Sequence, residues 1–144
     1  MHIILMWIAR HVEPLIRRMT KQFPALLITG ARQTGKTSLL RRLYPDASYL
    51  TLDLPVNAEA AHTAPDELLK AYPPPVIIDE IQYAPVLLRH LKVRIDQDRR
   101  PDRFLLTGSQ VFPLKGVSES LAGRCAVLNL HTLARAELIA GGAR

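Results

Sequence analysis

The stretch GARQTGKT, residues 30–37, constrains this chain of 144 residues more than any other segment. It follows the apolar run ALLIT, which has the length of a strand, and it leads into KTSLLRRLY, whose apolar residues have helical spacing. Gly30, Gly35, Lys36 and Thr37 satisfy the pattern G-x-x-x-x-G-K-[ST]. A strand, this loop and a helix in succession predict a polyphosphate site. The simpler alternative is a glycine-bearing turn before a basic helix.

The residue types in the loop match the chemistry of phosphate binding. Glycine permits backbone conformations and a close approach that side chains would block, so that N–H groups can surround a phosphate. Lys36 supplies a cation for the β- and γ-phosphates, the Thr37 hydroxyl can ligate Mg²⁺, and the helix adds its positive end. We therefore predict a nucleotide-binding loop made by Gly30, Ala31, Arg32, Gln33, Thr34, Gly35, Lys36, Thr37 and Ser38.

A second motif, VIIDE at residues 76–80, supplies carboxylates after a buried run. Ligands of open α/β sheets bind at the carboxyl ends of strands, where Asp79 would lie. Asp79 fits the Mg²⁺ carboxylate, together with Thr37. Glu80 fits the residue that polarises a water for attack on the γ-phosphate. The alternative for an Asp-Glu pair is a solvated helix start.

Two further positions extend this interpretation. LLTGSQ ends a third apolar run with Thr107 and Ser109, either of which could sense the γ-phosphate; an ordinary turn closed by Gly108 explains the segment equally well. Arg124 follows the short helical segment ESLAG. It is a candidate arginine finger for a neighbouring subunit, or a surface arginine at the end of a helix.

The alternation of the apolar runs with helical segments predicts the fold class. Five near-continuous apolar runs indicate a parallel sheet covered on both faces, in a three-layer α/β fold. An amphipathic helix over residues 9–23 precedes the first strand. Because no linker or repeat interrupts the chain, we expect one domain over residues 1–144.

The composition of the chain bears on its binding partners and on its cellular compartment. The net charge of +6 is compatible with nucleotides or nucleic acid. Nucleic-acid binding through the basic residues of 89–100 stays open, although charge on a helix face usually serves solvation. The single cysteine excludes an internal disulfide and fits a cytoplasmic setting. The apolar run at residues 3–9 is too short to cross a bilayer, so we expect no membrane partner.

Together, LLITGARQTGKTSLL, VIIDEIQYAPVLLRHLK, FLLTGSQ and ESLAGR resemble the AAA+-like branch of P-loop ATPases. The likeness is greatest to a prokaryotic group of ATP-binding proteins whose ATPase core precedes a C-terminal domain of unknown function. The resemblance implies strand order 5-1-4-3-2, with ATP and Mg²⁺ as ligands. It implies a Walker A motif at 30–37, a Walker B motif at 76–80 and a sensor at Ser109 or Thr107. The expected C-terminal part does not appear before Arg144.

These observations predict a Mg²⁺-dependent ATPase that couples hydrolysis to conformational change, acting with further copies of itself or with another protein. A nucleotide-binding switch or remnant with little hydrolysis is the main alternative. A small-molecule P-loop kinase is a third, although we find neither an arginine-rich lid nor an acceptor site in the sequence. Guanine specificity is disfavoured because no [NT]-K-x-D motif occurs.

Overall fold

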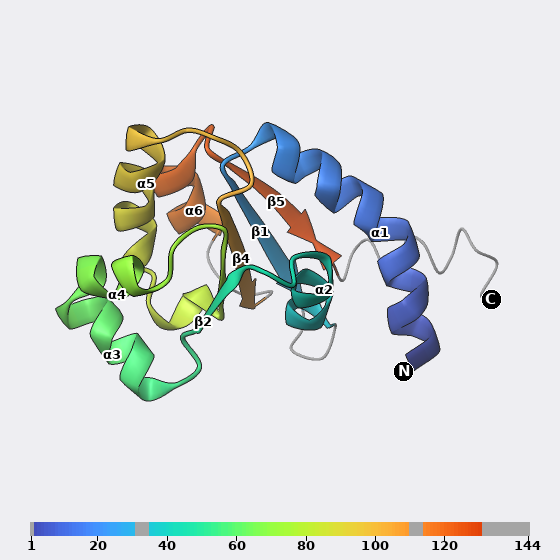
Figure 1. Cartoon of the computed structure of the whole chain (residues 1–144), viewed down its shortest axis with the longest axis horizontal. Helices are drawn as coiled ribbons and strands as arrows, with labels where there is room; N and C mark the ends of the chain where they lie inside the picture. The colour runs from blue at the N-terminus through green and yellow to red at the C-terminus, as the bar shows by residue number, and fades with distance from the viewer. Residues whose placement is uncertain (1, 31–34, 110–113, 131–144) are drawn as a thin grey trace.

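The computed structural model describes residues 2–30, 35–109 and 114–130. Its centre is a five-stranded sheet in the order β2-β3-β4-β1-β5, and every neighbouring pair of strands is parallel (Figure 1). This confirms the predicted order 5-1-4-3-2. The strands are β1 (Ala25–Gly30), β2 (Ser48–Thr51), β3 (Val76–Asp79), β4 (Phe104–Ser109) and β5 (Cys125–Asn129).

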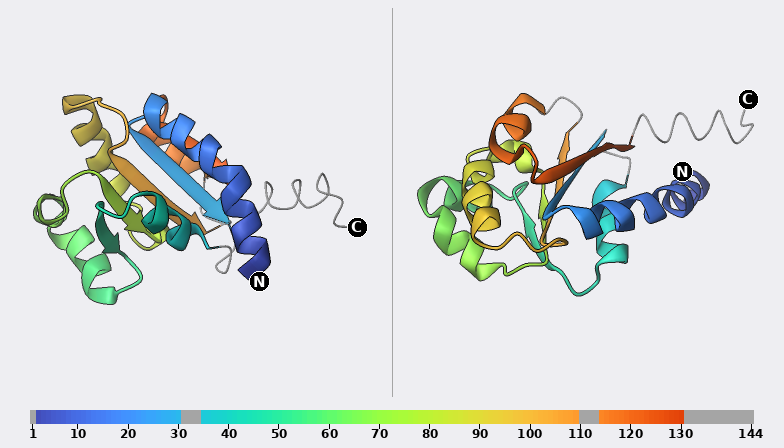
Figure 2. Two further views of the ribbon diagram at one scale, coloured as in Figure 1. Left: turned by 45° about the vertical axis from the view of Figure 1, so that its right-hand side comes forward. Right: turned by 90° about the horizontal axis from the view of Figure 1, so that it is seen from above.

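Helices cover both faces of this sheet, which makes the three layers that the sequence predicts. Figure 2 shows α1 and α2 on one side and the helices between β2 and β5 on the other. The helices are α1 (His2–Gln22), α2 (Lys36–Leu43), α3 (Pro55–Thr63), α4 (Pro65–Ala71), α5 (Leu87–Gln97) and α6 (Leu114–Leu121), with a short 3₁₀ helix η1 (Ile81–Tyr83) after β3. No helix among the described residues is long and apolar enough to cross a membrane.

The core is divided into two apolar clusters by the sheet itself. In β1, Leu26 and Ile28 belong to the cluster under α1 and α2, whereas Ala25 and Leu27 belong to the cluster on the opposite face. All six residues of β1 are buried. A strand covered on both faces favours apolar side chains at successive positions, which is why ALLI, residues 25–28, shows no alternation of apolar and polar residues.

The observed boundaries refine the expected ones. The N-terminal helix begins at His2 rather than near residue 9, and it buries Val12 and Ile16 against the sheet. The second strand ends at Thr51, because the chain turns there and Pro55 occupies the first turn of α3. Proline suits that position since the first helical N–H groups need no partner within the helix.

The register of the strands brings three predicted segments to one edge of the sheet. Gly30 at the end of β1 pairs with Ser109 at the end of β4. On the other side of β4, Ile78 of β3 pairs with Leu106, so Asp79 ends β3 beside Thr107. The carboxyl ends of β1, β3 and β4 therefore meet at one edge.

Candidate functional site

The predicted phosphate loop joins β1 to α2 at this carboxyl edge. Gly35 has φ 78° and ψ 23°, a left-handed conformation that glycine adopts without steric cost, and α2 starts at the next residue. Lys36 is 4% exposed, and its Nζ donates a hydrogen bond to the Gly30 carbonyl at 2.9 Å. The ammonium group thus lies over the end of β1. Ala31, Arg32, Gln33 and Thr34 lie outside the described residues.

Burial and two acidic residues have opposite effects on the pKa of Lys36. Burial lowers the pKa of the ammonium group below its ordinary value, while the negative charges of Glu80 and Asp79 act in the opposite direction. The lysine and both carboxylates are therefore close enough to interact electrostatically. A phosphate group at this edge would add negative charge and so favour the charged lysine further.

Asp79 is 8% exposed, and its carboxylate accepts hydrogen bonds from four hydroxyl groups. Thr37 and Thr107 donate to Oδ1, the latter at 2.7 Å. Tyr49 and Thr51 of β2 donate to Oδ2 at 3.2 and 3.0 Å. Burial and the nearby carboxylate raise the pKa of the Tyr49 hydroxyl, which keeps it a donor. A buried carboxylate with this many donors is held in one orientation.

Glu80 follows Asp79 in an uncommon conformation, with φ 61° and ψ 52°. A left-handed backbone costs a non-glycine residue of order 1 kcal/mol or more, and such strain clusters at functional sites. Its N–H donates to Thr107 Oγ1 at 3.0 Å, and its Oε2 accepts from Gln82 Nε2 at 2.6 Å. The turn directs the chain from β3 into η1 and places the Glu80 side chain beside the start of α2.

Two adjoining cavities lie at this edge, and Lys36 and Glu80 line both of them. One cavity of about 250 Å³ is completed by Gln82, Tyr83 and Ser109. The other, of about 130 Å³, is completed by Gly35, which directly precedes α2, and by Thr37 and Ser38 in the first turn of that helix. A third hollow of about 290 Å³ lies at the opposite edge of the sheet, lined by residues 74–75 and 100–103, and none of the predicted site residues lines it.

The structure thus brings together most of the sequence-predicted residues. Lys36, Thr37, Asp79 and Thr107 are connected through direct contacts or charge, and Ser109 lines the larger cavity. Ser109 contributes its backbone N–H to Gln82 Oε1 at 3.2 Å. Thr107 is fully buried beneath Asp79 and Glu80, so it supports these residues from inside the sheet.

Asp79 and Thr37 are the described residues whose oxygens could hold a metal ion beside Lys36. Among the described residues no group of three or more His, Cys, Asp or Glu could hold a metal ion. Mg²⁺ is usually bound by one or two carboxylates together with water and substrate phosphates. Asp79 and the Thr37 hydroxyl are oxygen donors of that kind, in contact with each other. These two residues could hold Mg²⁺ when phosphate is present.

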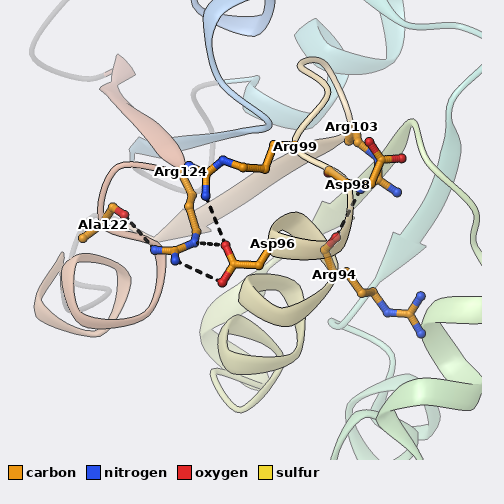
Figure 3. A network of polar contacts seen from close by, with 7 residues as sticks. All are labelled: Arg94, Asp96, Asp98, Arg99, Arg103, Ala122 and Arg124. Atoms are coloured by element: carbon orange, nitrogen blue, oxygen red, sulfur yellow. Dashed lines mark hydrogen bonds and ion pairs between the residues drawn. The ribbon is translucent and has the colours of Figure 1, made fainter.

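Arg124 does not join this group within the chain. It precedes β5, and its backbone carbonyl accepts from the N–H of Ala25, the first residue of β1. From Ala25 to Gly30 the strand spans about 17 Å. Figure 3 shows the Arg124 guanidinium facing Asp96, with Nε–Oδ1 at 2.7 Å and Nη2–Oδ2 at 3.1 Å. A role toward the nucleotide of a neighbouring copy stays a prediction.

Three residues of the site were missed by sequence reasoning. Tyr49 and Thr51 of β2 reach Asp79, and Gln82 of η1 reaches Glu80. The polar alternation of SYLT was the available signal for β2, since Tyr49 and Thr51 are two residues apart and share a face of the strand. Gln82 carried no comparable signal.

Comparisons with known proteins identify a family and two bacterial relatives. A family model described as an AAA domain matches residues 22–139. The chain is 38% identical over 126 residues to the uncharacterized protein Mb2031c of Mycobacterium bovis, and equally to Rv2008c of Mycobacterium tuberculosis. These alignments cover 86% of this chain, which spans 29% of the length of each relative.

Among solved structures, the match to C. elegans PCH-2 covers 96% of this chain and 44% of the PCH-2 chain, with 23% sequence identity and a TM-score of 0.42. The family match covers most of the chain and contains every residue of the site described above. The chain belongs to the AAA domain family.

Proposed function

We propose that this chain binds ATP with Mg²⁺ and hydrolyses it, and that hydrolysis changes its conformation. The observation that supports the proposal best is the cavity pair at the carboxyl edge, which Lys36 and Glu80 share and beside which Asp79 is held by Thr37. Membership of the AAA domain family supports nucleotide binding at this edge.

In this proposal Lys36 and the start of α2 bind the phosphates. The lysine is already bent toward Gly30, so a phosphate oxygen could replace the carbonyl as its partner without a large movement of the side chain. The first N–H groups of α2 have no partners within the helix and carry the positive end of its dipole. Mg²⁺ would neutralise charge on the β- and γ-phosphates, with Asp79 and Thr37 as its protein contacts.

Glu80 is the residue proposed to act on water. Its carboxylate would accept a proton from a water that attacks the γ-phosphorus, while the bond from that phosphorus to the bridging oxygen of ADP breaks. The strained backbone at Glu80 fits such a role, because the left-handed turn brings its side chain to the cavities that Lys36 lines. Ser109 at the end of β4 lines the larger cavity and is the proposed sensor.

The proposal is tested by measuring phosphate release and ATP affinity for the purified chain and for Glu80→Gln. We expect the variant to bind ATP as the wild type does and to release phosphate at least about 100-fold more slowly, since general base catalysis contributes roughly that factor. Glu59→Gln on the exposed side of α3 serves as the matched control and should leave both quantities unchanged.

Equal release from the wild type and Glu80→Gln would refute the assigned role of Glu80. Tight ATP binding without any turnover by the wild type would favour the nucleotide-binding switch instead. Transfer of the phosphate to a metabolite, with less free phosphate released, would favour a kinase.

A further inference from the structure

Gln82 connects two parts of the proposed site that are far apart in the sequence. Its Nε2 donates to Glu80 Oε2 at 2.6 Å, and its Oε1 accepts from the backbone N–H of Ser109 at 3.2 Å. The side chain is half-buried and lines the cavity that Lys36, Glu80 and Ser109 also line. One amide therefore joins the end of β4 to the carboxylate that follows β3.

The chemistry of its two neighbours fixes the orientation of this amide. A carboxylate accepts hydrogen bonds, and a backbone N–H donates them. The NH₂ group must therefore face Glu80 and the carbonyl oxygen must face Ser109, because the flipped amide would lose both bonds. A hydrogen bond to a charged acceptor is stronger than one between neutral groups, which favours this orientation further.

The close approach of β4 to η1 depends on Gly108. A Cβ at this position would lie 3.3 Å from Ile81 Cγ2 and 3.7 Å from Gln82 Oε1. The first distance is tighter than most Cβ contacts, so a larger residue would require the Ile81 side chain to shift by a few tenths of an ångström. Glycine at 108 and the left-handed turn at Glu80 together bring Gln82 within reach of Ser109.

We infer that Gln82 is a positioning residue, which holds the Glu80 carboxylate where it can accept a proton from the attacking water and ties its position to the end of β4. This inference rests on the proposed hydrolysis. Gln82 engages Oε2, and Oε1 of Glu80 has no hydrogen-bond partner among the described residues. A carboxylate fixed by one oxygen can use the other to accept the proton of a water. A movement of β4 at Ser109 would be transmitted through the same amide.

Two substitutions separate the two hydrogen bonds of the Gln82 amide, one to Glu80 and one from Ser109. Gln82→Leu loses the donor to Glu80 and the acceptor for Ser109. Gln82→Glu loses the donor but keeps an oxygen that can accept from Ser109. Gln97→Leu, at the exposed end of α5, is the matched control for the leucine variant.

Hydrogen exchange on the nucleotide-free chain provides a readout that does not depend on turnover. We expect the Ser109 amide to exchange faster in Gln82→Leu and to stay protected in Gln82→Glu and Gln97→Leu. In steady-state assays we expect both Gln82 variants to lower kcat at least about tenfold, because a small displacement of a catalytic group has effects of that size. The Kd for ATP should be unchanged in Gln82→Leu and Gln97→Leu, whereas the negative charge added by Gln82→Glu should weaken ATP binding.

The outcomes distinguish this inference from the proposed function. Wild-type kcat in both Gln82 variants, with a wild type that hydrolyses ATP, would overturn the positioning role and leave the ATPase intact. In Gln82→Leu, which adds no charge, a loss of ATP affinity equal to the loss of kcat would also overturn it, since a positioning residue acts on the chemical step. A wild-type chain that binds ATP without turnover would overturn both.

Discussion

Thr107 donates its hydroxyl hydrogen to Asp79 at 2.7 Å and lies fully buried in β4. The same oxygen accepts the backbone N–H of Glu80 at 3.0 Å. One hydroxyl thereby fixes both the carboxylate proposed to hold magnesium and the backbone turn that follows it. Thr107 was predicted as a sensor of phosphate, and its position gives it a direct structural role beneath the site.

Replacing Thr107 by valine removes this hydroxyl with little change in shape. The Glu80 N–H loses its acceptor and Asp79 loses one donor in a buried setting, so we expect the free energy of unfolding to fall by about 1–3 kcal/mol. Urea denaturation measures this loss. Thr107→Ser keeps the hydroxyl and should lose less, and Thr63→Val on exposed α3 should have almost no effect. A stability of Thr107→Val equal to that of the wild type would contradict the described network.

Lys36→Met tests the phosphate-binding role of the lysine while keeping its apolar stem. We expect the ATP affinity to fall at least about tenfold, because the cation that would face the β- and γ-phosphates is lost. The fold should persist, since methionine fills a similar volume against the end of β1. Isothermal titration and circular dichroism measure the two quantities. The control Lys70→Met lies on an exposed face of α4, away from the site.

Unchanged ATP affinity in a folded Lys36→Met variant would remove the central support for the proposed nucleotide site. A variant that fails to fold would instead assign Lys36 a structural role at the end of β1. Thermal melting before the titration separates these two results.

Asp79→Asn separates the magnesium requirement from nucleotide binding itself. The amide keeps the size of the side chain but removes the negative charge that favours a cation. We expect ATP affinity in EDTA to be little changed and its enhancement by added Mg²⁺ to be largely lost. A magnesium titration at constant ATP measures the difference. The control Asp46→Asn, exposed after α2, should respond to Mg²⁺ as the wild type does. A wild-type response of Asp79→Asn to Mg²⁺ would show that Asp79 has no part in metal binding.

The sequence predicted the inner strands well, because β1, β3 and β4 are buried on both faces and their sequences are nearly unbroken apolar runs. Strand order came from the family resemblance, since no local pattern encodes which strands become neighbours. The contacts of Tyr49 and Thr51 with Asp79 depend on the register that pairs Thr51 with Asp79. That register arises from tertiary packing, which explains why β2 was not assigned to the site.

The edge of the sheet at which Arg124 lies could have been predicted from the topology alone. A residue directly before a strand of a parallel sheet lies at the edge opposite to residues that follow strands, such as Asp79 and Ser109. The helical segment before Arg124 suggested a finger, whereas the position before β5 indicates the far edge within the same chain. Its partner there, Asp96, comes from α5 and is distant in sequence, so the ion pair was not foreseeable.

Arg124→Gln and Asp96→Asn together test what this arginine does. Both break the exposed Arg124–Asp96 pair, and Asp96→Asn also breaks the exposed pair with Arg99. We expect small decreases in melting temperature and unchanged ATP turnover in both. Because the Arg124 hydrogen bond lowers the pKa of Asp96, the pair stabilises the fold above the unfolded pKa of that carboxyl. The contribution is lost as the pH falls through the lower folded pKa, so the wild type and both variants should converge in acid.

An arginine finger predicts a different pattern from the same two variants. A finger acts on the nucleotide of a neighbouring copy, so Arg124→Gln alone would lower turnover, and the loss would be clearest at protein concentrations that favour self-association. Asp96→Asn would keep the arginine and with it the activity. Turnover measured over a range of protein concentrations therefore decides between an ion pair that joins α5 to the start of β5 and a catalytic contact between copies of the chain.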